Sequence, residues 1–242
     1  MNKTVPEAVN FARDLVSAVK GCKNTDILIC VPFTDLVPLY DVITGSNVML
    51  GAQNMHFEDS GAFTGEISAA MLETAGCSYV IIGHSERRQY FGETNALLNK
   101  KLLKVVKTGL LPIFCVGEIL EQRKSGVTQK VVEEQIKTGL AGISRSEFEK
   151  ITIAYEPVWA IGTGETATPD QAEEVHRYIR KIIGQLYGDD AARELRIQYG
   201  GSVNEKNAAD LLKRDDIDGA LIGGASLKID SFVEIINITD QL

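Results

Sequence analysis

The chain has 242 residues, of which 44% are hydrophobic, and it carries a formal net charge of −8 at neutral pH. This length fits one large domain with a sizeable core, and we expect residues 1–242 to form a single domain. No block of Lys or Arg interrupts the acidic background, so nucleic acid and anionic membrane surfaces are poor partners.

The first predicted element is a helix at the N-terminal end. Thr4 and Glu7 have the spacing of a capping box, and Gly21 is a suitable stop. Between them, apolar residues recur with helical spacing. These residues are Ala8, Ala12, Leu15, Val16 and Val19.

After this helix, short apolar runs alternate with amphipathic segments to the end of the chain. Strands that are apolar on both faces and alternate with helices predict a parallel sheet covered by helices. The expected strands are 27–31, 48–52, 79–82, 111–116, 151–155, 195–199 and 219–222. The expected helices after the first are near 35–44, 65–75, 94–108, 128–140, 169–187, 204–213 and 231–238.

The first predicted helix has no strand before it, which leaves seven strands for eight helices. A closed (β/α)₈ barrel needs eight strands. We therefore expect an α/β fold of the TIM (β/α)₈-barrel type in which the first β-strand is missing. Its absence would expose the ladder edges of the strands that start near Ile27 and Gly219.

One carboxylate stands at a distinctive place in this pattern. Glu156 directly follows the apolar run 151–155 and precedes Pro157, which restricts Glu156 to an extended backbone. A glycine-containing stretch follows, and Thr168-Pro169-Asp170-Gln171 then has the signature of a helix start. This order predicts a catalytic base beneath a flexible lid.

A histidine falls at an equivalent strand end. Active sites of such barrels form at the C-terminal ends of the strands, and His84 follows the strand run 79–82. A helical turn capped by Ser85 is expected next, and its N-terminal end would keep the imidazole of His84 neutral. A lone histidine is more often structural, but His84 lies at a strand end, as Glu156 does, and this shared position favours a functional role.

Glycine pairs follow the last two expected strands. Gly200-Gly201 and Gly223-Gly224 would bring bare backbone N–H groups close together, which suits a phosphate. Gly162-Thr163-Gly164 adds a third such stretch. The alternative is that these glycines only make tight turns.

The other two histidines and the cysteines carry no clear function. His56 lies in a polar loop and His176 in mid-helix beside Arg177, so both are expected at the surface. No cluster has metal-ligand spacing, so we expect no metal. The four cysteines form no C-x-x-C pair and are expected to be reduced, mostly buried thiols: Cys22, Cys30, Cys77 and Cys115. With no recognisable signal peptide or bilayer-length apolar run, the expected location is the cytoplasm.

The motifs in their order resemble the triosephosphate isomerase family over essentially the whole chain. The motifs that carry the resemblance are G-A-Q-N (51–54), G-A-F-T-G-E (61–66), V-I-I-G-H-S-E-R-R (80–88), C-V-G-E (115–118), A-Y-E-P-V-W-A-I-G-T-G (154–164), Y-G-G-S-V (199–203) and I-G-G-A-S-L (222–227).

The resemblance implies interconversion of dihydroxyacetone phosphate and D-glyceraldehyde 3-phosphate without a cofactor. Glu156 matches the base, His84 the neutral electrophile, and Glu86 a carboxylate that helps to position the site. Residues 158–168 match a closing lid. The matching phosphate-binding positions are Gly162, Ser202, Gly223 and Gly224.

The resemblance also implies a homodimer. The G-A-F-T-G-E loop is similar to one that docks into a partner subunit, with Thr64 reaching towards the neighbouring active site.

The chain departs from the family at its start. The family begins with a strand that runs into an Asn-x-Lys motif, and neither the strand nor the catalytic Lys is in this sequence. Loss of one preorganised donor costs roughly a hundred- to a thousandfold in rate, so a catalytically impaired binding or dimerisation module is one alternative. Another phosphate-binding barrel enzyme, such as an epimerase, is a second alternative that would need different acid and base residues.

Overall fold

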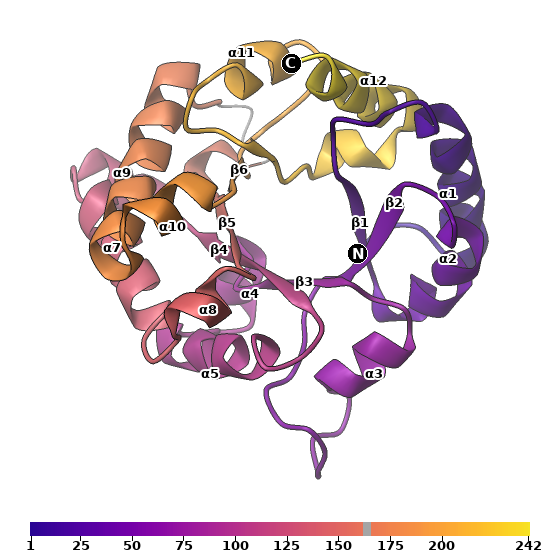
Figure 1. Cartoon of the computed structure of the whole chain (residues 1–242), viewed down its shortest axis with the longest axis horizontal. Coiled ribbons are helices and arrows are strands. Elements are labelled where there is room, and N and C mark those ends of the chain that lie inside the picture. Colours follow the sequence, from indigo (N-terminus) through magenta and orange to yellow (C-terminus); the bar gives the residue numbers. More distant parts are fainter. Residues whose placement is uncertain (162–165) are drawn as a thin grey trace.

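A seven-stranded parallel sheet organises the computed structural model, which describes residues 1–161 and 166–242. The strands pair in chain order from β1 to β7, and a ring of helices surrounds them (Figure 1). The strands are β1 (Ile27–Val31), β2 (Val48–Ala52), β3 (Tyr79–Ile82), β4 (Leu111–Val116), β5 (Thr152–Tyr155), β6 (Ile197–Tyr199) and β7 (Gly219–Ala220).

The described residues contain twelve α-helices and three 3₁₀ helices. The α-helices are α1 (Val5–Val19), α2 (Leu36–Ile43), α3 (Ala69–Thr74), α4 (Ser85–Tyr90), α5 (Asn95–Val105), α6 (Leu120–Lys124), α7 (Thr128–Gly139), α8 (Arg145–Phe148), α9 (Pro169–Tyr187), α10 (Asp189–Glu194), α11 (Ala208–Leu212) and α12 (Ile229–Asp240). The 3₁₀ helices are η1 (Phe33–Asp35), η2 (Val158–Ala160) and η3 (Gly224–Leu227).

The predicted strands are confirmed, and the predicted number of eight helices is wrong. The first four strands begin and end at the predicted residues, whereas the last three are shorter than predicted. The additional helices are α4, α6, α8 and α10, each of four to six residues. So short a helix shows too few apolar repeats for periodicity to reveal it.

The helix starts follow the predicted capping signals. At the start of α9, the Gln171 amide donates to the Thr168 hydroxyl at 3.2 Å, and the Thr168 amide donates to the Gln171 side chain at 3.0 Å. At the start of α1, the amide and the hydroxyl of Thr4 both donate to Glu7, each at 2.7 Å. At each helix start, these bonds give a partner to backbone amides that have none within the helix.

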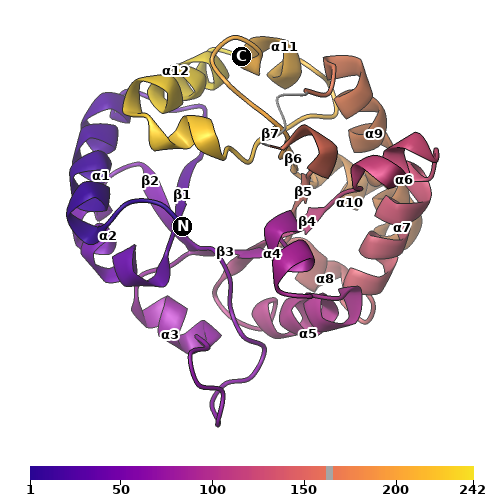
Figure 2. The ribbon, with the colours of Figure 1, turned by 180° about the vertical axis from the view of Figure 1, so that it is seen from behind.

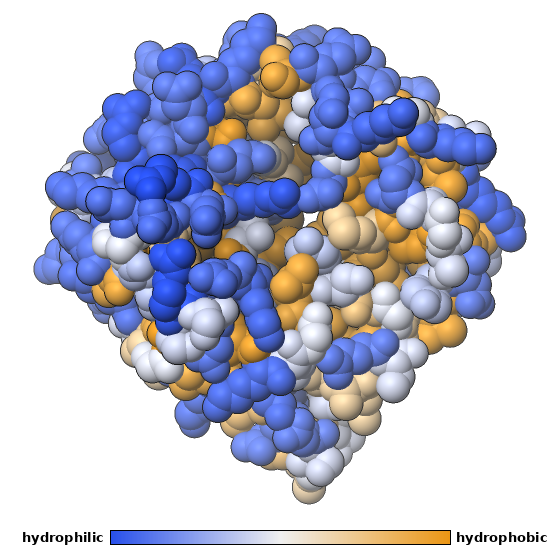
Figure 3. Space-filling view, in the orientation of Figure 1, coloured by the Kyte–Doolittle hydropathy of each residue, from blue (hydrophilic) through white to orange (hydrophobic). Residues whose placement is uncertain are grey.

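The sheet curls into a barrel that stays open between its two ends. β1 and β7 are the first and last strands in the sheet order, as expected for the strands that start at Ile27 and Gly219. A cavity of about 1330 Å³ lies between them and extends into the barrel. On the face shown in Figure 3, apolar and hydrophilic side chains together border a central opening. Figure 2 shows the opposite face, with α4 and α6 in front.

Two layers of apolar side chains hold the sheet. Along β4, Phe114 packs in the large core between the sheet and the helices, while Ile113 and Cys115 face the barrel interior with Ala154 of β5. Successive strand residues point to opposite faces, so burial of both faces requires the continuous apolar runs seen in the sequence.

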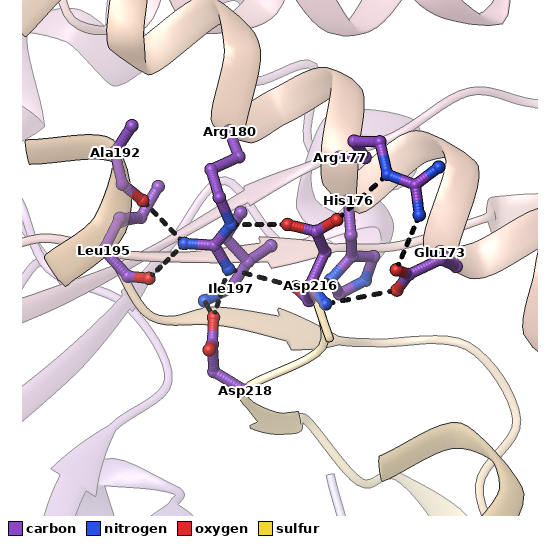
Figure 4. Close-up of polar contacts among 9 residues, drawn as sticks. All are labelled: Glu173, His176, Arg177, Arg180, Ala192, Leu195, Ile197, Asp216 and Asp218. Atoms are coloured by element: carbon purple, nitrogen blue, oxygen red, sulfur yellow. Dashed lines mark hydrogen bonds and ion pairs between the residues drawn. The ribbon is translucent and has the colours of Figure 1, made fainter. Parts of the chain in front are cut away.

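A polar network joins α9 and α10 to the segment before β7 (Figure 4). The Arg180 guanidinium pairs with Asp216 at 2.7 Å and with Asp218 at 2.8 Å, and it also donates to two carbonyl oxygens at the end of α10. Asp218 in turn accepts from the amide of Ile197 at 2.7 Å. The network therefore ties helix and sheet together at the end of the barrel where β6 and β7 begin.

The prediction that His176 lies at the surface is wrong. His176 is fully buried on α9, and its Nδ1 lies 3.1 Å from the carbonyl oxygen of Asp216 (Figure 4). Burial lowers the pKa of His176 to about 4. The polar neighbour Arg177 misled the sequence prediction, because one helix face can be buried while the next residue is exposed. His56 is half-buried and stacks on Phe57.

None of the helices in the described ranges is long and apolar enough to cross a membrane.

Candidate active site

Glu156 is buried directly after β5. Its side chain is at the C-terminal end of the sheet, its residue exposure is only 2%, and its amide donates to the Val116 carbonyl at 2.8 Å. Gly200 packs against it closely, since a Cβ on Gly200 would lie 2.9 Å from Glu156 Cγ. The neighbouring strands therefore fix the position from which this carboxylate extends.

The carboxylate of Glu156 is held by the segment that follows β3. Its Oε2 accepts from the Ser85 amide at 2.9 Å, and its Oε1 accepts from the Ser85 hydroxyl at 3.1 Å. The same Oε1 lies 3.1 Å from Nε2 of His84. The two strand ends that the sequence placed at one level thus bring these side chains into direct contact.

The His84 ring has a defined tautomer in this arrangement. Its Nδ1 accepts a hydrogen bond from the Glu86 amide at 3.3 Å, so the ring proton lies on Nε2 and points to Glu156. His84 is thus the N-cap of α4, and the prediction that Ser85 caps this helix is wrong. Ser85 instead uses its hydroxyl on Glu156.

Glu86 lines the same cavity as His84 and Glu156, but its side chain points largely to solvent. Its side chain is 67% exposed, and its Oε2 is 3.9 Å from His84 Nδ1. The structure therefore gives Glu86 one close contact with the histidine, which is made by its backbone amide.

The environment raises the pKa of Glu156 above its usual range. Burial is the largest cause, because it disfavours the charged form. The His84 side chain and the two hydrogen bonds from Ser85 act in the opposite direction. A carboxyl group with a raised pKa is a stronger base when it is ionised, which suits proton abstraction.

A second buried carboxylate supports the segment after Glu156. Glu118 is fully buried, and it accepts from the Tyr155 hydroxyl at 3.1 Å and from the Trp159 indole at 2.9 Å. Arg123 lies 3.9 Å away. Burial raises the pKa of Glu118. This cluster anchors η2, the start of the predicted lid.

One cavity collects most of the predicted site residues. The cavity of about 1330 Å³ between β1 and β7 is lined by His84, Glu156, Ser202, Gly223 and Gly224. A Cβ on either of the last two glycines would meet nothing within 4 Å, so their backbones face open space. The predicted phosphate position Gly162 lies outside the described residues, as does the whole glycine stretch 162–164.

Thr64 lies away from this group. It is exposed on the loop between β2 and α3, which projects from the ring of helices (Figure 1). The structure therefore does not bring Thr64 to Glu156 and His84 within one chain.

The sequence reasoning missed the contacts that three residues make with Glu156, although it had named Ser85 as a helix cap and Gly200 as part of a glycine pair. Ser85 holds the carboxylate of Glu156, and Gly200 crowds its side chain. Gly117 lies against the Glu156 backbone so closely that a Cβ on it would overlap the Glu156 carbonyl oxygen. A contact between residues at the ends of two different strands leaves no pattern in the nearby sequence. Each of the three residues does, however, lie just after a predicted strand.

No group of three or more His, Cys, Asp or Glu side chains suited to a metal ion occurs in the described part of the chain.

The family model described as triosephosphate isomerase matches residues 1–239. The curated triosephosphate isomerase of Carboxydothermus hydrogenoformans is 55% identical over 236 residues, which are 98% of this chain and 94% of that protein. The triosephosphate isomerase of Clostridium botulinum strain Loch Maree is 53% identical over 237 residues, which are 98% of this chain and 95% of that protein.

The fold is similar to a solved structure of the same kind. The crystal structure of triosephosphate isomerase from Bartonella henselae superposes with a TM-score of 0.89 at 41% sequence identity. The match covers 98% of this chain and 94% of that one.

Proposed function

This chain belongs to the triosephosphate isomerase family and has the isomerase activity of that family, and we propose that Glu156 is its catalytic base. The substrates are triose phosphates; the proposed pair is dihydroxyacetone phosphate and D-glyceraldehyde 3-phosphate. One observation carries the proposal. The Glu156 carboxylate and the His84 Nε2–H meet 3.1 Å apart in the cavity that Ser202, Gly223 and Gly224 also line.

In the proposed reaction, ionised Glu156 removes a proton from C1 of dihydroxyacetone phosphate. The electrons of the broken C–H bond form a C1–C2 double bond, and the carbonyl oxygen takes up the negative charge. A proton passes from the C1 hydroxyl to the C2 oxygen, a transfer proposed for His84, and return of the carbon-bound proton from Glu156 to C2 then leaves a carbonyl at C1, which is the aldehyde. Glu156 must leave its hydrogen bonds with Ser85 to reach the substrate, so these bonds define a resting position of the base.

His84 is proposed to stabilise the charge on the substrate oxygen. Its Nε2–H points towards Glu156, and therefore towards the place where the reacting carbons must lie. Donation from a fixed N–H to the developing oxyanion is the form of stabilisation that such a site can supply. The Glu86 amide supports this role because it keeps the proton off Nδ1.

The phosphate is proposed to bind at the two glycine pairs that follow β6 and β7. Ser202, Gly223 and Gly224 line the cavity, and a Cβ on Gly223 or Gly224 would meet nothing within 4 Å, which leaves room for a ligand beside their backbone. Backbone N–H groups are suitable partners for a phosphate in an acidic protein. Gly162 is proposed to join them from the lid, which would exclude water from the reaction.

A homodimer is proposed from the exposed loop between β2 and α3. Phe63 on this loop is 42% exposed beside Thr64, and a projecting loop with an apolar tip suits insertion into a second copy. We place the protein in the cytoplasm, where the triose phosphates of glycolysis are interconverted.

The direct test of the base is Glu156→Asp, which withdraws the carboxylate by one methylene. Catalysis depends steeply on ångström-scale placement, so we expect kcat to fall by about a hundredfold while KM changes little. Isomerase assays in both directions would measure this. Equal kcat in the variant and the parent protein would exclude Glu156 as the base.

A further inference from the structure

We propose that Gln135 is a positioning residue for the isomerase reaction, because it holds the backbone segment against which Glu156 rests. The inference builds on the proposed role of Glu156 as the base. Gln135 lies on α7, outside the cavity lining, and the hydrogen bonds of its side chain go to Gly117 rather than to Glu156. Its effect on catalysis must therefore pass through the residue that it binds, which is Gly117.

Gln135 binds both peptide groups of Gly117 with one side chain. The Gly117 amide donates to Gln135 Oε1 at 2.7 Å, and Gln135 Nε2 donates to the Gly117 carbonyl oxygen at 2.9 Å. Gly117 directly follows β4, where the strand ladder no longer supplies these partners. The side-chain amide of Gln135 thus supplies the hydrogen-bond partners that a neighbouring strand would supply within the sheet.

Gly117 in turn packs against the backbone of Glu156. A Cβ on Gly117 would overlap the Glu156 carbonyl oxygen, so only glycine permits this contact. On either side of it, the Val116 carbonyl accepts from the Glu156 amide at 2.8 Å, and the Glu118 carbonyl accepts from the Val158 amide at 3.1 Å. Residues 116–118 therefore form a backbone support for the base.

The hydrogen bonds of Gln135 therefore fix the backbone position from which the Glu156 side chain extends. Without Gln135, two partly buried backbone groups of Gly117 lose their partners and must move to find water. Because Gly117 and Glu156 touch through their backbones, such a shift moves Glu156 as well. Displacement of the reacting carboxylate lowers kcat more than it weakens substrate binding.

Two variants separate the hydrogen bonds. Gln135→Met keeps the length of the side chain and removes both bonds, whereas Gln135→Glu keeps an acceptor for the Gly117 amide and loses the donor to its carbonyl. We expect kcat to fall by about tenfold in Gln135→Met and by less in Gln135→Glu, with KM changed by less than about twofold.

Asn99 offers a matched control. Its Nδ2 donates to the carbonyl oxygens of Gly139 and Ala141, each at 2.8 Å, so it is also an amide side chain that holds backbone. It does not line the active-site cavity. Asn99→Leu is expected to lower the thermal midpoint and to leave kcat within about twofold of the parent protein.

A Glu156→Asp background tests whether Gln135 acts through the base. If it does, Gln135→Met costs less in that background, at most about threefold, since the carboxylate is already displaced. The same tenfold loss in both backgrounds would overturn the inference, as would a kcat for Gln135→Met equal to that of the parent. Should Gln135→Met fail to fold, Gln135→Glu carries the same comparison.

The two proposals fail in different ways. Parent-like turnover of Glu156→Asp alone removes Glu156 as the base. Parent-like turnover of both Gln135 variants, beside an impaired Glu156→Asp, removes only the role of Gln135.

Discussion

Both carboxylate oxygens of Glu156 accept hydrogen bonds from Ser85, one from its amide at 2.9 Å and one from its hydroxyl at 3.1 Å. These bonds favour the ionised carboxylate, and so they oppose the burial that raises its pKa. Ser85 therefore holds the carboxylate of Glu156, the proposed base, in place and also favours its charged form.

Ser85→Ala removes the hydroxyl bond and is expected to raise the pKa of Glu156 further. Activity is lost as the pH falls and Glu156 takes up a proton, so a higher pKa moves the acid limb of the kcat/KM profile to higher pH. The profile is measured beside Ser17→Ala, which changes an exposed serine on α1. An acid limb at the parent position or at lower pH would contradict this account.

Gly200→Ala is expected to lower kcat through direct pressure on the base. The added Cβ would lie 2.9 Å from Glu156 Cγ and 3.2 Å from the Tyr155 carbonyl oxygen, so the Glu156 side chain must shift. We expect a loss of about tenfold or more in kcat. Gly21→Ala is the control, because its Cβ meets nothing within 4 Å. Equal kcat values for the two variants would show that the crowding has no effect on catalysis.

His176 makes the stability of the fold sensitive to acid. Burial lowers its pKa from 6.5 to about 4. Between these two pH values, His176 is protonated in the unfolded chain and neutral in the folded protein. The free energy of unfolding is therefore unaffected by protonation of His176 above pH 6.5 and falls as the pH is lowered towards 4. The decrease between pH 7 and pH 5 is about 2 kcal/mol.

His176→Asn removes this titration and keeps a side-chain donor for the Asp216 carbonyl. Urea unfolding at pH 7 and at pH 5 would measure the effect. The parent protein is expected to lose about 2 kcal/mol more than the variant between these two conditions. Identical losses would mean that other groups cause the acid sensitivity.

Thr64→Arg tests the proposed dimer. The loop that carries Thr64 is exposed in one chain, and a long charged side chain at its tip would be costly to bury against a partner. Sedimentation at several protein concentrations should show a dimer for the parent and a shift to monomer for the variant. A parent protein that is monomeric at all concentrations would exclude the dimer.

Much of the fold was predictable because the strand signal is local. The first four strands have the predicted bounds, and the sheet order follows from strands that are buried on both faces. The short helices α6, α8 and α10 were not predicted, since they carry too little periodicity, and α4 was expected only as a helical turn with the wrong cap. The seven strands leave β1 and β7 at the two ends of the sheet, as the uneven strand count indicated.

The site was predictable as far as it depends on strand ends. Glu156 and His84 each follow a strand, and the C-terminal ends of parallel strands lie at one edge of the sheet. Ser85, Gly117 and Gln135 depend on distances between elements that no spacing in the chain encodes. The burial of His176 was missed because its polar neighbour Arg177 is exposed, and the sequence does not show which face of α9 packs inward.

Isomerisation of dihydroxyacetone phosphate in D₂O tests the central claim most directly. If Glu156 carries the proton, its carboxyl group exchanges with solvent, and the aldehyde formed by the parent protein contains deuterium at C2. Glu156→Gln is expected to abolish both conversion and deuterium incorporation, while circular dichroism shows a folded protein. Incorporation by Glu156→Gln at the parent rate would contradict the assignment of the base.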